Sequence, residues 1–337
     1  MSPDSMKFDD PALQQSKSIG VLLTNLGTPQ APTTTAVRRF LAQFLWDPRV
    51  IELSRPLWWL ILHCFILRFR PRISAEAYRS VWTEDGSPLL TGVKKQAQAL
   101  SALSGPGLQF AIGMRYGEPS IENGLTRLAR AGVEKILVLP LYPQYSATTT
   151  ASTFDAIAHA FQRWRQIPSI AFVADYHNDP NYIESLAHSI LAAWDHRERA
   201  QRLLFSFHGI PKRYVQAGDS YESQCEETVR LVTNRLRLAD NEWHLAYQSR
   251  VGREEWLKPY TDEVLIQWGR DKVQSVEVIC PGFSSDCLET LEEIDQRYRQ
   301  LFQEAGGGAF HYIPALNDSE SHILALRAII HRHLGWS

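Results

Sequence analysis

Short runs of apolar residues alternate along this chain with longer segments in which apolar residues recur every three or four positions. The runs are typical of strands buried on both faces, and the spaced positions are typical of amphipathic helices. The pattern predicts eight strands, at about 18–27, 108–115, 135–142, 170–175, 203–208, 243–248, 276–281 and 310–316. It predicts helices at about 35–46, 75–82, 89–103, 119–131, 151–165, 181–196, 219–237, 261–270, 284–304 and 319–333.

This alternation predicts an α/β protein, because parallel strands need a crossover connection that is usually a helix. Four predicted strands precede residue 177 and four follow it, and the irregular stretch 47–88 interrupts the first group. We therefore expect two similar doubly wound domains, each with a four-stranded parallel sheet, that face each other across a cleft. An eight-stranded β/α barrel is the alternative. The expected division is a tail at 1–17, a first domain at 18–176 and a second domain at 177–337.

The most apolar stretch runs from Leu57 to Leu67 and contains two tryptophans. Eleven residues are too few for a helix that spans a bilayer. Arg68, Arg70 and Arg72 follow closely. An apolar face flanked by arginines suits a membrane surface, and an ordinary core helix explains the stretch equally well.

Composition narrows the class of protein. The chain has 35 Lys and Arg against 37 Asp and Glu, a net charge of −2, which gives no electrostatic case for nucleic-acid binding. It has no G-x-G-x-x-G, Walker or H-E-x-x-H motif, and residues 1–17 lack the apolar core of a signal peptide. A reduced, cytoplasmic setting is expected because no C-x-x-C pair or zinc spacing occurs among Cys64, Cys225, Cys280 and Cys287.

One histidine stands at a position that favours function. The buried run from Leu203 to Phe207 ends at His208, and Gly209 and Pro211 then stop the strand. Ligands of open parallel sheets bind at the carboxyl ends of strands, so His208 would lie at the mouth of a cleft. The alternative is a polar residue that ends a strand and bonds its own turn.

Acidic residues crowd the start of the helix expected after the 276–281 strand. Asp286 and Glu289 have capping-box spacing, and acidic side chains suit a helix N-terminus, which is one interpretation. Asp286, Glu289 and Glu293 also share a helix face. If the strand before them neighbours the strand of His208, then His208 and Glu289 could hold a divalent metal or transfer protons.

Five sequence blocks resemble the ferrochelatases, the enzymes that place iron into a porphyrin. The blocks occur in the order found in that family and span roughly residues 20 to 320. They are Leu23–Pro29, Leu139–Ser146, Leu204–Pro211, Tyr247–Gly252 and Pro281–Thr290. The resemblance implies two α/β domains around a deep porphyrin cleft. It also implies insertion of Fe²⁺ into protoporphyrin IX, which gives protohaem and two protons in the last step of haem biosynthesis.

The resemblance also implies roles for individual residues. His208 and Glu289 would be the catalytic pair and the metal ligands, and whether His208 takes protons, holds iron or does both stays open. Asp286 and Glu293 would extend an acidic track behind Glu289. The implied porphyrin contacts are Asn25, Leu26, Tyr78, Ser87, Arg115, Tyr116 and Trp256, and the candidates for binding the propionates are Arg68, Arg70 and Ser87.

The stretch at about 50–88 resembles the apolar lip of the family, and its Leu57–Leu67 segment could touch a membrane on the cytoplasmic side. No permanently bound cofactor is expected, since Fe²⁺ is a substrate. No [2Fe–2S] cluster is expected either, because no cysteine follows Cys287 and Ala147 stands where cluster-bearing members have another. We expect a monomer whose last helix could pack back on the first domain.

Three other activities are compatible with these residues. A ferrochelatase of the same fold could act on coproporphyrin, and a cobalt chelatase of similar architecture could select another metal. A binding protein with two α/β lobes could carry haem or a metal without turnover. The pairing of His208 with Glu289 favours an enzyme, because a carrier needs no proton acceptor over the porphyrin ring.

Overall fold

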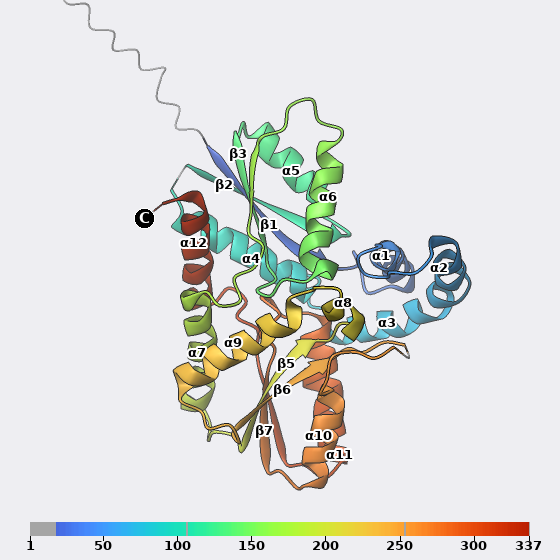
Figure 1. The fold of residues 1–337 in the computed structure, drawn as a ribbon, viewed down its shortest axis with the longest axis vertical. Coiled ribbons are helices and arrows are strands. Elements are labelled where there is room, and N and C mark those ends of the chain that lie inside the picture. Colours follow the sequence, from blue (N-terminus) through green and yellow to red (C-terminus); the bar gives the residue numbers. More distant parts are fainter. Residues whose placement is uncertain (1–17, 106, 253, 337) are drawn as a thin grey trace, which may run out of the picture.

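Two separate parallel sheets form the framework of the protein (Figure 1). The computed structural model describes residues 18–105, 107–252 and 254–336. The strands in these ranges are β1 (Ile19–Gly27), β2 (Leu108–Tyr116), β3 (Lys135–Pro140), β4 (Ser169–Phe172), β5 (Arg202–His208), β6 (Trp243–Gln248), β7 (Ser275–Ile279) and β8 (Ala309–Ile313). The first sheet has the order β2-β1-β3-β4 and the second β6-β5-β7-β8, with all neighbours parallel. The predicted α/β class is confirmed, and the barrel is excluded because the two sheets do not join.

The strand order puts β1 and β5 in the interior of their sheets. β1 pairs with β2 on one side and β3 on the other, and β5 pairs with β6 and β7 in the same way. From each central strand the chain adds the next strand on one side and the following strand on the other. In open parallel sheets, ligands bind at the carboxyl ends of the strands at such a switch point. His208 is the last residue of β5, so the fold places it at the carboxyl end of the central strand of the second sheet.

Helices cover both faces of each sheet, as right-handed crossovers require. The first sheet packs on α5 and α6 on one face and on α4 on the other, and the second packs on α9 and on α10 and α11. The helices are α1 (Thr34–Trp46), α2 (Arg55–Ile61), η2 (Leu62–Ile66), α3 (Leu67–Val81), α4 (Pro88–Leu103), α5 (Ile121–Arg130), η3 (Ala147–Ala151), α6 (Ser152–Phe161), α7 (Pro180–Asp195), α8 (Lys212–Gln216), α9 (Tyr221–Leu236), α10 (Thr261–Arg270), η4 (Glu289–Tyr298), α11 (Arg299–Glu304) and α12 (Glu320–Leu334), where η marks a π-helix.

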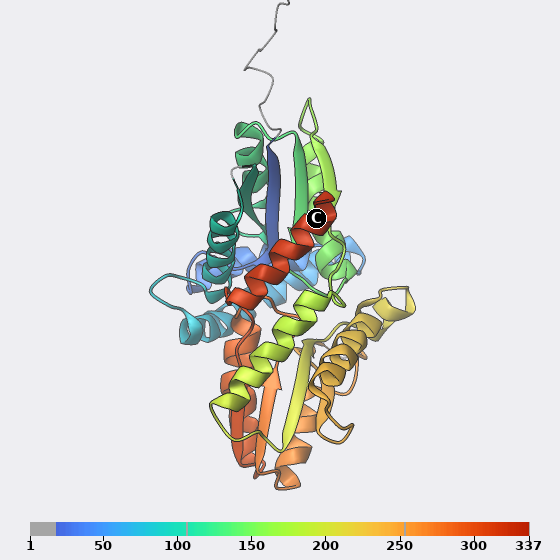
Figure 2. The ribbon, with the colours of Figure 1, turned by 90° about the vertical axis from the view of Figure 1, so that its left-hand side faces the viewer.

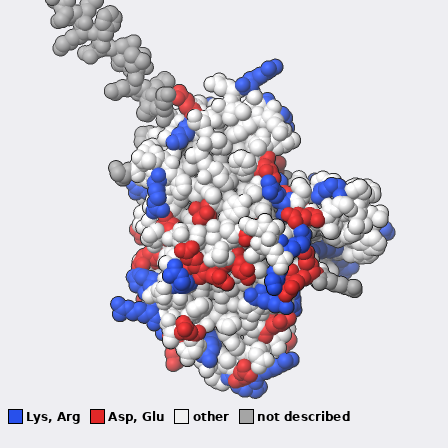
Figure 3. Space-filling view, in the orientation of Figure 1, with Lys and Arg blue, Asp and Glu red and all other residues white. Residues whose placement is uncertain are grey.

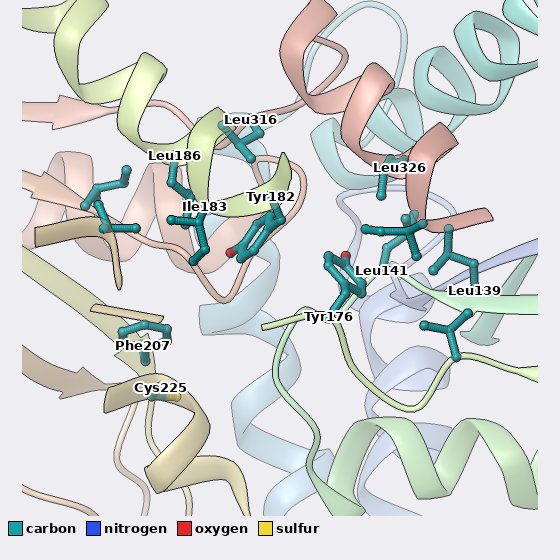
Figure 4. Close-up of a cluster of buried hydrophobic side chains, with 14 of the residues drawn as sticks. Leu139, Leu141, Tyr176, Tyr182, Ile183, Leu186, Phe207, Cys225, Leu316 and Leu326 are labelled. Atoms are coloured by element: carbon teal, nitrogen blue, oxygen red, sulfur yellow. The ribbon is translucent and has the colours of Figure 1, made fainter. Parts of the chain in front are cut away.

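The largest apolar core joins the two halves of the molecule. It contains Leu139 of the first sheet and Phe207 of the second, with Tyr176 and Tyr182 between them (Figure 4). The two tyrosine rings meet edge to face with centroids 5.4 Å apart. Because one continuous core is shared, moving one half would expose apolar surface of the other.

The last helix reaches across to the first half. Helix α12 packs on α7 and also contacts α4 and β3. Figure 2 shows α12 beside the upper sheet, with α7 continuing along the lower one. The final helix therefore helps to hold the two sheets in one relative position. The predicted domain boundary at 176/177 stays a prediction.

His177 links the two halves by charge. Its Nδ1 lies 2.7 Å from Oδ1 of Asp175, and its Nε2 lies 3.0 Å from Oε2 of Glu227 on α9. Burial lowers the pKa of His177, but the hydrogen bonds to the two carboxylates outweigh that effect, and the pKa is raised. His177 therefore favours the charged form that can donate to both partners.

The raised pKa of His177 makes this link depend on pH. Its contribution to stability is fully present below the unfolded pKa of about 6.5 and is lost as pH rises through the higher folded pKa. We expect His177→Gln to lower the free energy of unfolding more at pH 6 than at pH 9, measured by denaturant titration. His188→Gln is the control, because His188 forms an exposed pair with Glu184 at 3.0 Å. Equal losses for His177→Gln at both pH values would contradict the prediction.

Candidate active site

His208 presents one free ring nitrogen at the end of β5. Its Nδ1 lies 2.7 Å from the carbonyl oxygen of Gly209, which can only accept, so Nδ1 carries the proton. Nε2 is then the unprotonated nitrogen and can act as a base or a metal ligand. The imidazole is half-buried, so the ring is held by the protein and still reaches solvent.

Glu289 begins the π-helix η4, which follows β7. Strands β5 and β7 are direct neighbours, with Phe205 opposite Ile279, so the condition set by the sequence for a His208–Glu289 pair is met. The side chain of Glu289 is half-buried, and its backbone carbonyl accepts a hydrogen bond of 2.9 Å from Nε2 of Gln248. π-Helical turns widen a helix and are frequent at functional sites.

The helix predicted at 284–304 starts later in the structure than the sequence suggested. It begins at Glu289, as η4, and continues as α11. The backbone N–H of Asp286 donates to Oδ1 of Asn317 at 2.9 Å, so it is not capped by Glu289. The capping-box interpretation is wrong, because that motif requires the Glu289 carboxylate at this N–H. The carboxylate of Glu289 therefore does not cap the backbone N–H of Asp286.

Asp286 is fully engaged by neighbouring donors. Its Oδ1 accepts from the hydroxyl of Tyr312 at 2.6 Å and from that of Thr290 at 3.0 Å. Its Oδ2 accepts from Nδ2 of Asn317 at 2.7 Å. These bonds anchor the segment that leads into η4, and the place of Asp286 in an acidic track stays a prediction.

Glu293 lies one turn further along η4 and is 6% exposed. Its carboxylate accepts from the backbone N–H of Ser249 at 3.1 Å and from the hydroxyl of Tyr298 at 2.9 Å. Arg297 lies 3.3 Å away and supplies a positive charge. These partners satisfy the buried carboxylate of Glu293 within the protein.

Tyr78 of helix α3 approaches Glu289 from the first half of the chain. Helix α3 packs on η4, and Tyr78 is buried. Burial, and then the negative charge of Glu289, raise the pKa of Tyr78 well above its usual value. The phenol of Tyr78 thus lies in the surroundings of Glu289, and its contact with a porphyrin stays a prediction.

Asn25 and Leu26 lie near the carboxyl end of β1. Asn25 is buried, and its Oδ1 accepts from the backbone N–H of Leu26 at 2.7 Å. Ser87 is buried just before α4, where it stands at the N-cap position without a side-chain cap bond. The porphyrin contacts of these three residues stay predictions.

Arg115 and Tyr116 end β2 and share a buried acidic partner, Asp47. Arg115 forms an ion pair with Asp47 and donates through Nε to Ser152 at 2.6 Å. The hydroxyl of Tyr116 donates to Oδ2 of Asp47 at 2.8 Å. Burial comes first among the effects that raise the pKa of Tyr116. Sequence reasoning missed Asp47 and Ser152, because no local pattern relates residues so far apart in the chain.

Trp256 stands beside His208. The two ring centroids are 6.5 Å apart, and Trp256 forms a backbone bridge with Pro211, just after β5. The indole N–H of Trp256 is buried and has no hydrogen-bond partner among the described residues. The sequence placed this residue at the cleft wall, and the structure brings it to the histidine.

Helices α2, η2 and α3 protrude from the first half of the molecule (Figure 1). Trp58 and Leu62 are buried and anchor this lip on the rest of the protein. The core-helix alternative therefore holds only for the inner face. Figure 3 shows largely uncharged surface on the protrusion. Arg68 and Arg70 of α3 are exposed. The outer face exposes Leu57 (52%), Trp59 (51%), Leu60 (50%), Phe65 (60%), Phe69 (65%) and Ile73 (69%).

The ranges that the structure describes are 18–105, 107–252 and 254–336. They contain no group of three or more His, Cys, Asp and Glu side chains that could hold a metal ion. Within the same ranges, no helix has the length and apolar character needed to cross a bilayer. The assignment of His208 and Glu289 as metal ligands stays a prediction.

The sequence profile of one family, described as Ferrochelatase, matches residues 18–334. This chain belongs to the ferrochelatase family. The chain is 54% identical to "Ferrochelatase" of Nitrosococcus oceani over 95% of its length and 88% of the relative. It is 52% identical to "Ferrochelatase" of Thioalkalivibrio sulfidiphilus, over 98% of this chain and 92% of the relative. The identification of the family from five sequence blocks is confirmed.

Solved structures confirm the ferrochelatase fold as a chelatase architecture. SirB from Bacillus subtilis with Fe³⁺ has a TM-score of 0.57 at 11% identity and covers 94% of this chain and 95% of its own. The sirohydrochlorin chelatase SirB from Bacillus subtilis subspecies spizizenii, in complex with cobalt, has a TM-score of 0.56 at 13% identity with the same coverage. At this level of identity the likeness concerns the fold alone.

Proposed function

We propose that this protein is a ferrochelatase that inserts Fe²⁺ into protoporphyrin IX to give protohaem and two protons. The arrangement of His208 and Glu289 carries this proposal. In the neutral imidazole His208 offers an unprotonated Nε2, and the carboxylate of Glu289 does not cap the N–H of Asp286. His208 ends one strand and Glu289 follows its direct neighbour in the same sheet. Family membership supports the same activity.

The reaction needs a proton acceptor above the porphyrin ring. Two pyrrole N–H protons leave as Fe²⁺ binds the four ring nitrogens, and Nε2 of His208 can accept one at neutral pH. The carboxylate of Glu289 can accept a proton or replace water on the incoming iron. Asp286, just before Glu289, and Glu293, one turn after it, would extend the acidic track.

The porphyrin would bind in the crevice between the two sheets. Trp256 beside His208 offers an aromatic wall and a free indole N–H. The other proposed contacts are Asn25, Leu26, Tyr78, Ser87, Arg115 and Tyr116, with Arg68 and Arg70 as further candidates for the propionates. A rigid crevice that fits a bent macrocycle would favour metal entry, because a distorted ring exposes its nitrogen lone pairs.

No resident cofactor is part of this proposal. A [2Fe–2S] cluster needs four thiolates. Burial raises the pKa of Cys225, Cys280 and Cys287 well above the usual value, which keeps these thiols protonated. Cys64 is exposed on the lip and stands apart. We propose that the protein works as a monomer on the cytoplasmic side of the membrane.

The direct test is an anaerobic assay of purified protein with protoporphyrin IX and Fe²⁺. Conversion of the porphyrin spectrum to that of the metalloporphyrin, with many turnovers above a control without enzyme, is expected. Faster turnover with coproporphyrin III would assign the substrate to that porphyrin. Porphyrin binding without turnover of either substrate would overturn the enzyme and favour a carrier.

We further propose that the outer face of the lip rests on a lipid surface. Its exposed apolar side chains next to arginines have the composition of an interfacial helix. A triple variant, Trp59→Ser, Phe65→Ser and Phe69→Ser, is expected to lose most of its co-sedimentation with anionic vesicles. Phe154→Ser, at an exposed site on α6, should bind as the unaltered protein does. Unchanged sedimentation of the triple variant would refute membrane contact through the lip.

A further inference from the structure

Gln248 is a buried amide between the two proposed catalytic residues. It ends β6, directly opposite His208 in the register of the sheet, and it is 1% exposed. A buried amide has to satisfy all its hydrogen-bonding groups inside the protein. The partners of Gln248 therefore show what the residue does.

The backbone of Gln248 supports the histidine. Its carbonyl oxygen accepts from the N–H of Gly209 at 2.8 Å. The carbonyl of the same Gly209 accepts from Nδ1 of His208 at 2.7 Å. One peptide unit thus connects Gln248 to the bond that sets the tautomer of His208 and leaves Nε2 free.

The side chain of Gln248 reaches the other member of the pair. Its Nε2 donates to the backbone carbonyl of Glu289 at 2.9 Å and lies 3.5 Å from Oε2 of Glu293. This carbonyl lies in the first turn of η4. The bond therefore holds the residue that begins the π-helix, and Glu289 is that residue.

The side-chain amide of Gln248 cannot exchange the positions of its oxygen and nitrogen without losing hydrogen bonds. Its Oε1 accepts from the hydroxyl of Ser206 at 2.8 Å, and that hydroxyl is 2.9 Å from Oγ1 of Thr261. The thiol of Cys280 lies 3.6 Å from the same oxygen. These donors keep Oε1 on the β5 side and Nε2 toward η4.

We propose that Gln248 is a positioning residue that holds Glu289 at a set distance from His208, an inference that rests on the proposed function of that pair. The hydrogen-bond partners of its side chain include the carbonyl of Glu289 and the hydroxyl of Ser206. Gln248 joins the end of β5 to the start of η4 through one rigid side chain. Catalytic groups have to be held within about 0.5 Å of their working geometry, so loss of this connection lowers the rate at constant substrate binding.

The test begins with Gln248→Met, which keeps the length of the side chain and removes both hydrogen bonds. We expect kcat for metal insertion to fall about 10- to 100-fold, as for other residues that orient metal ligands. The KM for porphyrin should stay within about twofold of the wild-type value. A fall in kcat of less than about threefold in a folded Gln248→Met protein would overturn the proposal.

Gln248→Glu adds a readout that a purely structural role would not move. The new carboxyl would face Glu293 on η4, Cys280 after β7, and the hydroxyls of Ser206 and Thr261. Protonated, it can still donate to the carbonyl of Glu289. Ionised, it repels both that carbonyl and Glu293. Activity of this variant should approach the wild type at low pH and fall as pH rises, relative to the wild-type profile.

Gln144→Met is the matched control. Gln144 is 2% exposed, and its Nε2 donates to Thr228 at 2.9 Å, away from the pair. This variant should lose stability and keep its kcat. An equal loss of kcat in Gln144→Met, or a Gln248→Glu variant with the wild-type pH profile, would overturn the proposal. Absence of turnover in the wild-type protein would instead refute the proposed function.

Discussion

Replacing His208 by alanine is expected to lower the rate of metal insertion by about 10²- to 10⁴-fold, the usual contribution of a positioned acid or base. The substitution removes the free Nε2 that the bond to Gly209 leaves available at the end of β5. Porphyrin binding should be largely kept, because the sheet and the neighbouring Trp256 remain. Anaerobic insertion assays give the rate, and spectral titration with protoporphyrin IX gives the dissociation constant.

His244→Ala is the control for this experiment. His244 lies on β6, near the opposite end of the same sheet, and its ring faces Trp268 at 5.9 Å. Burial lowers the pKa of His244, which favours the neutral form of this imidazole. Its loss should leave turnover within about twofold. Near-normal turnover of His208→Ala would remove His208 from the mechanism.

Glu289→Gln is expected to lower the rate by about 10²-fold or more, because it keeps the shape of the side chain and removes its charge. An amide can neither accept a proton nor replace a water ligand on Fe²⁺ as a carboxylate does. The stability of the fold should change little, because the backbone N–H of Asp286, which a capping box would pair with Glu289, donates to Asn317 instead. The free energy of unfolding should change by less than about 0.5 kcal/mol.

Glu292→Gln tests whether the effect belongs to position 289. Glu292 lies on the same π-helix, where burial, and then the charges of Glu293 and Glu289, raise its pKa against the opposing effect of Arg297. It carries no assigned role, so its neutralisation should leave the rate within about threefold. Equal rates for Glu289→Gln and the unaltered protein, or equal losses in both variants, would exclude a specific role for Glu289.

The main elements of the fold could be predicted because they depend on local patterns. A strand buried on both faces has to be apolar at successive positions, as in Leu203–Phe207. Such strands separated by helices leave few arrangements besides parallel sheets. His208 was identifiable for the same reason, since a polar residue followed by glycine and proline marks the carboxyl end of a buried strand.

The start of the acidic helix could not be predicted in the same way. Local spacing favoured a capping box at Asp286 and Glu289, but the structure gives the N–H of Asp286 to Asn317 and starts a π-helix at Glu289. The deciding partner, Asn317, lies 31 residues away. A hydrogen bond of that separation has no signature in a short window of sequence.

The sequence by itself determined the order of strands and helices, the family, and the residue types of the proposed pair, because periodicity and motifs are properties of neighbouring positions. Tertiary structure alone decided that Asp47 serves Arg115 and Tyr116, that Tyr78 meets Glu289, and that Gln248 joins Glu289 to the strand of His208. Those contacts follow from how sheets and helices pack, and packing is set by the whole chain.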